Sequence, residues 1–350
     1  MHTQSKYRLL VVRLGAMGDI LHALPAVTAL RQAHPSWIID WVVEPRWQAL
    51  LRAETTASKS SPVVDRLHLA ATREWRKAPF SGSTIHQINT LRRDLQAVDY
   101  DAVLDLQGSI RSAVLGWFSR CRRRIGESAP RESAARLLFT EHVETTGSHV
   151  IDQDIELASA IFCDELEPTV PMLPIDPAAE VWADGILSPG SAPGVLINPG
   201  AGWGAKRWPV ERYAAVAQAL IAEGCRVFVN AGPGEEPLSA SILQAVPTAT
   251  PLSGSLVQLI ALTRRIALCI AGDTGPLHLA CALQKPVVGI YGPTDPARNG
   301  PYGTRFTVLR SPLSRRDHTR HAAPEAGLLT IEPAAVLQAA RALLANEDAE

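Results

Sequence analysis

The stretch RLLVVRLGAMGDILHALPAVTALRQAHP (residues 8–35) joins a β-branched apolar run to a longer segment of helix-forming residues. Residues 8–14 have the composition of a buried strand, and residues 18–35 have the length of a helix. Gly15 and Gly18 permit a tight turn between them. A strand that continues through a turn into a helix is the unit of a parallel sheet, so the stretch predicts an α/β fold.

The same order recurs along the chain in two series, separated by a Pro-, Gly- and Ser-rich stretch at about 165–193. We expect two doubly wound Rossmann-like domains that face each other across a cleft. The predicted bounds are 1–170 for the first domain, 171–193 for a linker and 194–350 for the second domain. Whether the last helix (333–347) packs back on the first domain is left open. Further predicted strands cover 37–44, 100–108, 194–202, 225–234, 266–275 and 286–296, and further helices cover 109–119, 208–224, 255–265 and 276–284.

Composition excludes several classes of protein. The net charge of −1 argues against a protein that coats nucleic acid. The five cysteines are scattered, which predicts reduced thiols and neither a disulfide framework nor a zinc site. The N-terminus lacks the pattern of a signal peptide, and no apolar run reaches the ~18 residues of a membrane span. We therefore expect a cytoplasmic protein.

Asp19 is the first candidate for chemistry, because it lies where the first helix begins. One interpretation is a helix cap, a role for which aspartate is favoured. The other is a general base that accepts a proton from an attacking hydroxyl, kept ionised by the helix dipole and by a nearby cation such as Arg13.

The block GDTGPLH (272–278) follows a predicted strand directly, and Pro276 suits the first turn of a helix. Free backbone amides at a helix N-terminus bind phosphate, so Thr274 and Gly275 are candidate diphosphate contacts. Asp273 could accept hydrogen bonds from sugar hydroxyls. His278 either donates to a phosphate or packs in the core.

The second domain opens on NPGAGWGAKRWP (198–209), a glycine-rich loop in which Lys206 is suited to a phosphate; an ordinary turn with a solvated lysine is the alternative. In GPGEE (232–236), Glu235 is suited to ribose hydroxyls or to a helix N-terminus. The third glycine of a dinucleotide-binding fingerprint is missing there, and no Walker-type phosphate loop exists in the chain.

Positive charge is concentrated in the first domain. Residues 66–137 hold thirteen Lys and Arg against seven Asp and Glu. Solvated helix faces explain much scattered charge, but this concentration on predicted loops favours an anionic ligand.

Taken together, the motifs resemble glycosyltransferase family 9, the ADP-heptose:lipopolysaccharide heptosyltransferases, over about residues 8–345. The stretch at 40–45, the block RxWRKxxF at 73–80 and the pair Arg131-Glu132 are more similar to heptosyltransferase I than to heptosyltransferase II. The five blocks that carry the resemblance are RLGAMGD (13–19), NPGAGWGAKRWP (198–209), GPGEE (232–236), GDTGPLHLA (272–280) and YGPTDP (291–296).

The resemblance implies a GT-B fold and an inverting transfer of L-glycero-D-manno-heptose from its ADP donor to a Kdo residue of Kdo2-lipid A. It implies an N-terminal acceptor domain and a C-terminal nucleotide-sugar domain, with Asp19 as the general base. It assigns donor binding to Ala201, Gly202, Lys206, Glu235, Asp273, Thr274, Gly275 and His278, and acceptor binding to Arg13, Arg73, Arg76, Lys77 and Arg131. Ala201 and Gly202 stand where the heptosyltransferase I pattern has two threonines, so backbone amides must replace two hydroxyl contacts. The polar stretch 311–327 is longer than the pattern predicts.

No dedicated cluster of metal-binding carboxylates is visible in the sequence, so we expect metal-independent catalysis without a cofactor. The expected partners are a nucleotide-diphosphate sugar and an anionic glycolipid at the inner leaflet, with no nucleic acid. We expect a monomer that is peripheral on the cytoplasmic face of the inner membrane. Three alternatives stay open: a relative acting on another sugar or acceptor, a nucleotide-sugar epimerase, and a non-catalytic nucleotide-binding module.

Overall fold

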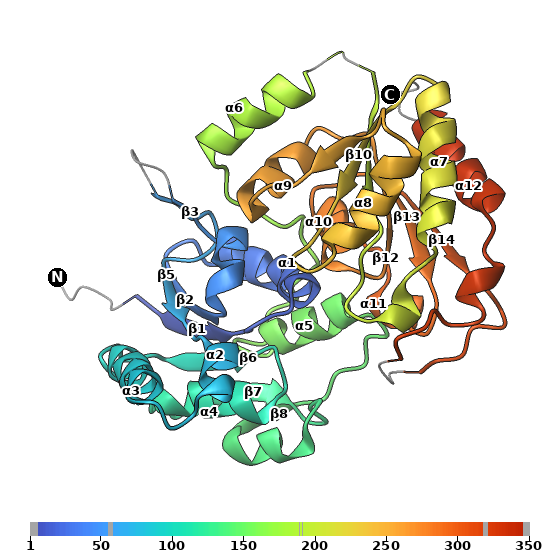
Figure 1. Cartoon of the computed structure of the whole chain (residues 1–350). Coiled ribbons are helices and arrows are strands. Elements are labelled where there is room, and N and C mark those ends of the chain that lie inside the picture. Colours follow the sequence, from blue (N-terminus) through green and yellow to red (C-terminus); the bar gives the residue numbers. More distant parts are fainter. Residues whose placement is uncertain (1–5, 55–58, 189, 191, 318–320, 346–350) are drawn as a thin grey trace. The chain divides into compact units, whose positions relative to one another are not determined.

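The computed structural model describes residues 6–54, 59–188, 190, 192–317 and 321–345. The chain divides into two compact units, Met1–Pro174 and Ile175–Glu350, hereafter unit 1 and unit 2 (Figure 1). The division falls inside the stretch for which the sequence predicts a linker.

Unit 1 is built on a six-stranded parallel sheet in the order β5-β2-β1-β6-β7-β8. Apart from the short hairpin β3-β4 (Ala53–Glu54 and Lys59–Ser60), the first strand along the chain lies in the middle and later strands extend to both sides. This order defines a doubly wound sheet. The strands are β1 (Arg8–Val12), β2 (Ile38–Val43), β5 (Arg66–Leu69), β6 (Ala102–Asp105), β7 (Arg124–Glu127) and β8 (Glu141–Val143).

Helices cover both faces of the unit 1 sheet. Helices α1 (Met17–Ala33) and α5 (Val150–Ser159) pack on each other. Leu10 and Val12 instead pack with α3 (Gly82–Gln96) and α4 (Ile110–Phe118) through Leu91, Leu95 and Leu115. Because successive residues of a strand point to opposite faces, the two helix pairs lie on opposite sides of the sheet (Figure 1). Burial on both faces explains why residues 9–12 of β1 are all apolar.

Unit 2 repeats the topology in the order β11-β10-β9-β12-β13-β14, again with every pair parallel. The prediction of an α/β fold with two doubly wound sheets is therefore confirmed. The strands are β9 (Gly194–Asn198), β10 (Arg226–Asn230), β11 (Thr250–Leu252), β12 (Leu268–Gly272), β13 (Val287–Tyr291) and β14 (Phe306–Arg310).

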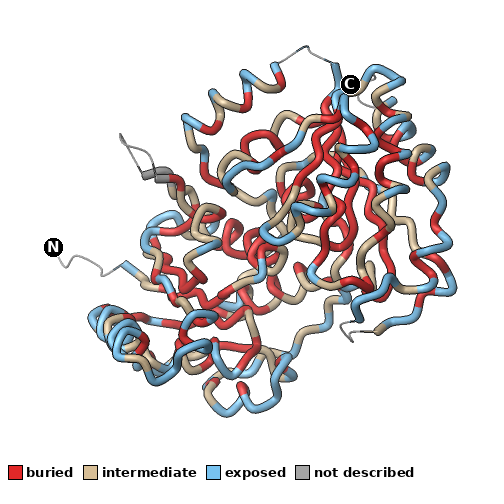
Figure 2. Tube along the Cα trace, in the orientation of Figure 1, coloured by how far each residue is buried: buried red, intermediate tan, exposed pale blue. Residues whose placement is uncertain are grey.

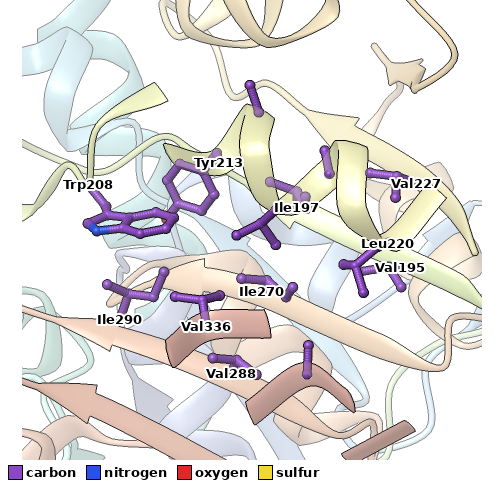
Figure 3. Packing of buried hydrophobic residues seen from close by; sticks show 14 of the residues in the cluster. Val195, Ile197, Trp208, Tyr213, Leu220, Val227, Ile270, Val288, Ile290 and Val336 are labelled. Atoms are coloured by element: carbon purple, nitrogen blue, oxygen red, sulfur yellow. The ribbon is translucent and has the colours of Figure 1, made fainter. Parts of the chain in front are cut away.

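One face of this second sheet carries a large apolar cluster. Side chains of β9, β12 and β13 pack against α7 (Val210–Ala222), α8 (Glu236–Ala245) and α12 (Pro333–Ala345). Figure 3 shows Val195, Ile197 and Ile270 facing this helical layer, with Trp208 and Tyr213 edge to face at 4.8 Å between ring centroids. The C-terminal helix α12 therefore belongs to the core of unit 2. Figure 2 shows the buried residues concentrated along the strands of both units.

The predicted linker contains structure of its own. Helix α6 (Pro177–Ile186) begins at Asp176, whose side chain accepts a hydrogen bond from the Ala179 amide at 2.9 Å. Its small residues Ala179 and Ala183 pack on α9 (Leu256–Thr263) through Ala261. The amphipathic helix has an apolar face to bury, and it buries it in unit 2.

Candidate active site

The carboxyl ends of six parallel strands share one edge in each unit, and the predicted site residues follow these ends. In unit 1, Arg13 follows β1, α2 (Thr72–Lys77) follows β5 and Arg131 follows β7; Asp105, which the sequence did not single out, ends β6. In unit 2, the loop 199–209 follows β9, Glu235 follows β10 and Asp273 follows β12. Ligands of open α/β sheets bind outside this edge.

Asp19 lies in the first turn of α1, and its structural role is compatible with a chemical one. The carboxylate Oδ2 accepts a hydrogen bond from the Ala16 amide at 2.8 Å. Oδ1 lies 3.8 Å from a guanidinium nitrogen of Arg13, whose Nε donates to the Asp19 carbonyl at 3.1 Å. The side chain of Asp19 is 38% exposed whereas that of Arg13 is 8% exposed. Arg13 thus fixes an accessible carboxylate from its buried side.

The loop that carries Asp19 is held by residues that sequence analysis missed. Gly15 has a φ of +137°, and a Cβ there would lie 2.6 Å from the indole nitrogen of Trp47. Trp47 belongs to the 3-10 helix η1 (Pro45–Leu50). On the other side, the Leu14 amide donates to the Gln107 side chain at 3.1 Å. Only glycine fits against the Trp47 ring at position 15. Both contacts join residues that are far apart in the sequence, so no local pattern predicted them.

The predicted acceptor cations lie at the same edge of unit 1. Arg73, Arg76 and Lys77 are exposed on α2, and Arg131 is exposed in the loop after β7. Arg46 is a cation that sequence analysis missed; its guanidinium lies 4.3 Å from the centre of the Trp47 ring. Burial, followed by the charge of Arg73, lowers the pKa of Arg46. Two arginines that repel each other in this way favour an anion beside them.

Asp105 is the most deeply buried carboxyl group at this edge. Its Oδ1 accepts hydrogen bonds from the Gln107 amide at 2.9 Å, the Gly108 amide at 2.8 Å and the Ser112 hydroxyl at 3.1 Å. Among the residues that the structure describes, Oδ2 has no partner. Burial raises the pKa of Asp105 to about 6, against the lowering effect of these bonds and of the Arg13 charge. The carboxyl group thus shapes the turn that carries Gln107.

Lys206, Asp273 and His278 form a buried ionic cluster in unit 2. The Lys206 ammonium lies 2.5 Å from Asp273 Oδ2, and His278 Nε2 lies 3.2 Å from Oδ1. Burial by itself would raise the pKa of Asp273, but the His278 hydrogen bond and the charges of Lys206 and His278 lower it well below its usual range. Lys206 is also 4.5 Å from the Trp203 ring centre. The solvated-lysine alternative is therefore wrong, because this lysine is nine-tenths buried.

The helix α10 (Gly275–Ala282) begins at Thr274, beside this cluster. The Thr274 hydroxyl donates to the Gly272 carbonyl at 3.2 Å and receives the Asn198 side-chain amide at 3.5 Å. Asn230 in turn donates to Asn198 at 2.6 Å. The first amides of a helix have no intrahelical acceptor, so Gly275 lies where an anion binds most readily.

Glu235 is held against a second glycine turn. Its Oε2 accepts a hydrogen bond from the Gly232 amide at 3.2 Å. A Cβ on Gly200 would lie 1.8 Å from the same oxygen, so glycine is required there for the carboxylate to reach the loop after β9. The structure thereby brings the glycine loop and the β10 turn together.

Ala201 and Gly202 differ in their surroundings. Ala201 is buried, and its carbonyl accepts from both the Nε and a terminal nitrogen of Arg207 at 3.4 and 3.3 Å. Gly202 is exposed, and a Cβ there would meet nothing within 4 Å. The replacement of hydroxyl contacts by backbone amides at these positions stays a prediction.

Within the described residues, no group of three or more His, Cys, Asp or Glu side chains is placed to hold a metal ion. In the same part of the chain, no helix combines the length and apolar character that crossing a membrane requires.

Fold and site together define a two-unit α/β protein of the GT-B type, with a buried cation and a helix N-terminus at one sheet edge and an accessible carboxylate with exposed cations at the other. The model of glycosyltransferase family 9 (heptosyltransferase) matches residues 88–327. The chain belongs to this family and is a glycosyltransferase.

Comparison with individual proteins agrees with this family. The chain is 30% identical to lipopolysaccharide heptosyltransferase 1 of Escherichia coli K12, over 87% of this chain and 94% of that protein. It is 25% identical to lipooligosaccharide heptosyltransferase 2 of Haemophilus influenzae, over 97% and 99%. The structure of E. coli heptosyltransferase WaaC with ADP-2-deoxy-2-fluoro heptose superposes with a TM-score of 0.75 at 28% identity, over 95% of this chain and 98% of that one.

Proposed function

We propose that the protein transfers heptose from ADP-L-glycero-D-manno-heptose to a Kdo residue of Kdo2-lipid A in the lipopolysaccharide inner core, with inversion at the anomeric carbon. The buried Lys206–Asp273–His278 cluster beside the α10 N-terminus is the observation that carries the donor half of the proposal. The solved relative that holds an ADP-heptose analogue supports it, and so does the 30% identity to the lipopolysaccharide heptosyltransferase 1 of E. coli K12.

In this proposal unit 2 binds the donor. Lys206 has three N–H donors, of which one serves Asp273, so the ammonium can also contact a diphosphate oxygen. The amides of Thr274 and Gly275 add hydrogen bonds at the positive end of α10, and Ala201 and Gly202 supply further backbone amides. Glu235 accepts from the ribose hydroxyls, and His278 holds Asp273 in place. Lys206 and the backbone amides stabilise the negative charge that develops on the departing ADP.

Unit 1 binds the acceptor and supplies the base. Asp19 removes the proton of the acceptor hydroxyl. The hydroxyl oxygen forms a bond to the anomeric carbon as the bond between that carbon and the ADP oxygen breaks. Arg13 keeps the carboxylate oriented. Arg73, Arg76, Lys77 and Arg131 bind the carboxylates of Kdo and the phosphates of lipid A. The step needs no cofactor, and we propose that it needs no metal.

The exposed cations of unit 1 also suggest where the enzyme works. An acceptor embedded in a membrane presents many negative charges at the surface, which attract a basic edge. We propose a monomer that associates peripherally with the inner leaflet of the inner membrane. Flotation with anionic vesicles at increasing salt tests the association, which should weaken as salt screens the charges.

The activity is tested by incubation with ADP-heptose and Kdo2-lipid A, followed by mass spectrometry of the lipid and quantification of ADP. We expect one heptosyl unit per acceptor and an equal amount of ADP, and far slower product formation with Asp19→Asn. Consumption of the donor without transfer would instead identify an epimerase. Binding without consumption would identify a nucleotide-binding module, and a screen of other nucleotide sugars and acceptors would reveal a relative of different specificity.

A further inference from the structure

Residues 311–317 and 321–328 of unit 2, hereafter the segment, have no role in the proposed function, and the second part lies against the glycine loop that carries Lys206. The Ala205 amide donates to the His321 carbonyl at 3.0 Å, and the Glu325 amide donates to the Ala205 carbonyl at 3.2 Å. Both polar backbone groups of Ala205, the neighbour of Lys206, are therefore bound by this segment.

The contact is also sterically close. A Cβ on Gly204 would lie 1.7 Å from the Ala322 carbonyl oxygen and 2.9 Å from its Cα. These are backbone atoms, which cannot move aside as the end of a flexible side chain does. The glycine in the GAK turn is thus required for the segment to approach η3 (Gly204–Lys206).

Glu325 fastens the segment. Its Oε2 accepts hydrogen bonds from the Ser314 hydroxyl and the Leu328 amide, each at 2.9 Å. Ser314 and Leu328 stand near the two ends of the segment, so one carboxylate draws both ends together. Burial raises the pKa of Glu325, but hydrogen bonds from backbone amides and from Ser314 outweigh it and lower the pKa. The carboxylate is therefore held in its charged, accepting form.

The segment is further attached beside β13 and β14. The Asp317 amide donates to the Pro293 carbonyl at 3.1 Å, and Arg316 pairs with Asp295 at 2.5 Å. Arg310 donates to the Gly292 and Ser314 carbonyls, each at 3.2 Å. These contacts fix the segment to the sheet, which is the rigid body that also carries Asp273.

We propose that Glu325 is a positioning residue for the donor diphosphate: through the segment and Ala205 it holds η3 so that the Lys206 ammonium stays at Asp273 and at the phosphate position. The inference rests on the proposed function of Lys206. A binding group is precise only when the shell behind it is fixed. Because the effect passes through Lys206, it concerns ligands with a diphosphate and spares those without one.

The test compares ADP with adenosine, measured by calorimetric titration of the full-length chain. For Glu325→Ala we expect ADP affinity to fall about tenfold, which corresponds to ~1.4 kcal/mol, while adenosine affinity is unchanged. Glu325→Gln keeps one accepting oxygen and should recover part of the loss. Glu332→Ala is the matched control, because this exposed carboxylate near the same segment pairs with Arg212 at 3.2 Å instead; it should bind ADP as the parent does.

A double-mutant cycle separates positioning from general damage. In a Lys206→Ala background, Glu325→Ala should cause no further loss of ADP affinity. Equal losses for ADP and adenosine, or additive losses in the cycle, would overturn the inference. If Glu325→Ala does not fold, we use Ser314→Ala, which removes one hydrogen-bond donor to the same oxygen. Its affinities for ADP and adenosine are measured alone and in the Lys206→Ala background. Failure of the parent protein to bind ADP would instead overturn the proposed function.

Discussion

The two sheet edges hold their positive charge in opposite ways. In unit 2, Lys206 is buried and ion-paired with Asp273. In unit 1, Arg73, Arg76 and Lys77 are exposed, and no ion pair to them exists in the part of the chain that the structure describes. A buried cation needs a fixed counter-charge, because removing it from water costs several kcal/mol. An exposed cation needs none, and is neutralised only when a ligand arrives.

The difference matches two kinds of ligand. A diphosphate is a small anion of fixed geometry, for which a rigid, preorganised cation loses little entropy on binding. A glycolipid acceptor carries several anionic groups on flexible parts, for which mobile surface cations are better suited. Replacements of the two sets of cations should therefore have different effects: replacement of Lys206 in unit 2 should change stability and donor affinity, whereas replacement of the exposed cations in unit 1 should change acceptor use alone.

The largest expected effect is on turnover and comes from Asp19. Asp19→Asn keeps an oxygen that can accept from the Ala16 amide but removes the base, so kcat should fall by about 10²–10⁴-fold, with ADP affinity and melting temperature unchanged. Asp176→Asn, at the start of α6, is the control for an aspartate that only caps a helix. If Asp19→Asn kept the turnover of the parent protein, the Asp19 carboxylate would be only a helix cap, and unit 1 would not supply the general base.

The next effect is on stability and comes from the buried pair in unit 2. Lys206→Met leaves Asp273 without its ammonium partner, and breaking a buried pair costs about 3–5 kcal/mol; the remaining His278 contact reduces this. Adding Asp273→Asn should restore much of the stability without restoring ADP affinity. Chemical denaturation and ADP titration measure both. If Lys206→Met alone were as stable as the parent protein, the Lys206–Asp273 pair would not be a preorganised element of the site.

Sequence analysis predicted the central elements because they are buried on both faces. The strands β1, β9, β12 and β13 read as continuous apolar runs, and each continues through a glycine-containing turn. The edge strand β8 (EHV) and the neighbouring β7 (RIGE) were not predicted, since their charged residues interrupt any apolar pattern. The strand β14 (FTVLR) at the edge of the unit 2 sheet was not predicted either; its residues are exposed or only partly buried.

The site was predictable to the extent that it lies in contiguous motifs. Thr274, Gly275 and His278 follow Asp273 directly, so their proximity was visible. The contacts of Trp47 with Gly15 and of Gln107 with Leu14 join residues about 30 and 90 positions apart, and no local pattern encodes them. The ion pair that holds Lys206 was equally invisible, because its partner Asp273 lies about 70 positions away in the sequence.

The pH dependence of stability tests a buried carboxyl group in unit 1, Asp105, which has no ion-pair partner among the residues that the structure describes. Asp105 has an ordinary pKa of 3.8 and a pKa of about 6 when folded. Its contribution to stability is therefore greatest below pH 3.8, declines as pH rises toward 6 and is lost above that, by roughly 2–3 kcal/mol.

Asp105→Asn keeps an accepting oxygen for the three donors to Oδ1 and does not ionise. Relative to this variant, the parent should lose free energy of unfolding between pH 4 and 6 in urea titrations. A difference between the two proteins that does not change with pH would show that the carboxyl group is not buried as the structure places it.

The smallest expected effects come from single cations of unit 1. Replacement of Arg73, Arg76 or Lys77 by Gln should raise the acceptor KM a few-fold each, since one exposed charge contact contributes about 0.5–1 kcal/mol, and should leave ADP affinity and stability unchanged. Arg122→Gln is the matched control, because Arg122 is also exposed but precedes β7 and so lies at the amino edge of the sheet. If these cations form one anion site, the triple variant with all three replaced should lose roughly the sum of the single contributions to acceptor binding. Added salt should reduce the difference in acceptor KM between this variant and the parent protein. If the triple variant had the acceptor KM of the parent protein, the acceptor would bind elsewhere. The assignment of acceptor binding to unit 1 and donor binding to unit 2 would then be wrong.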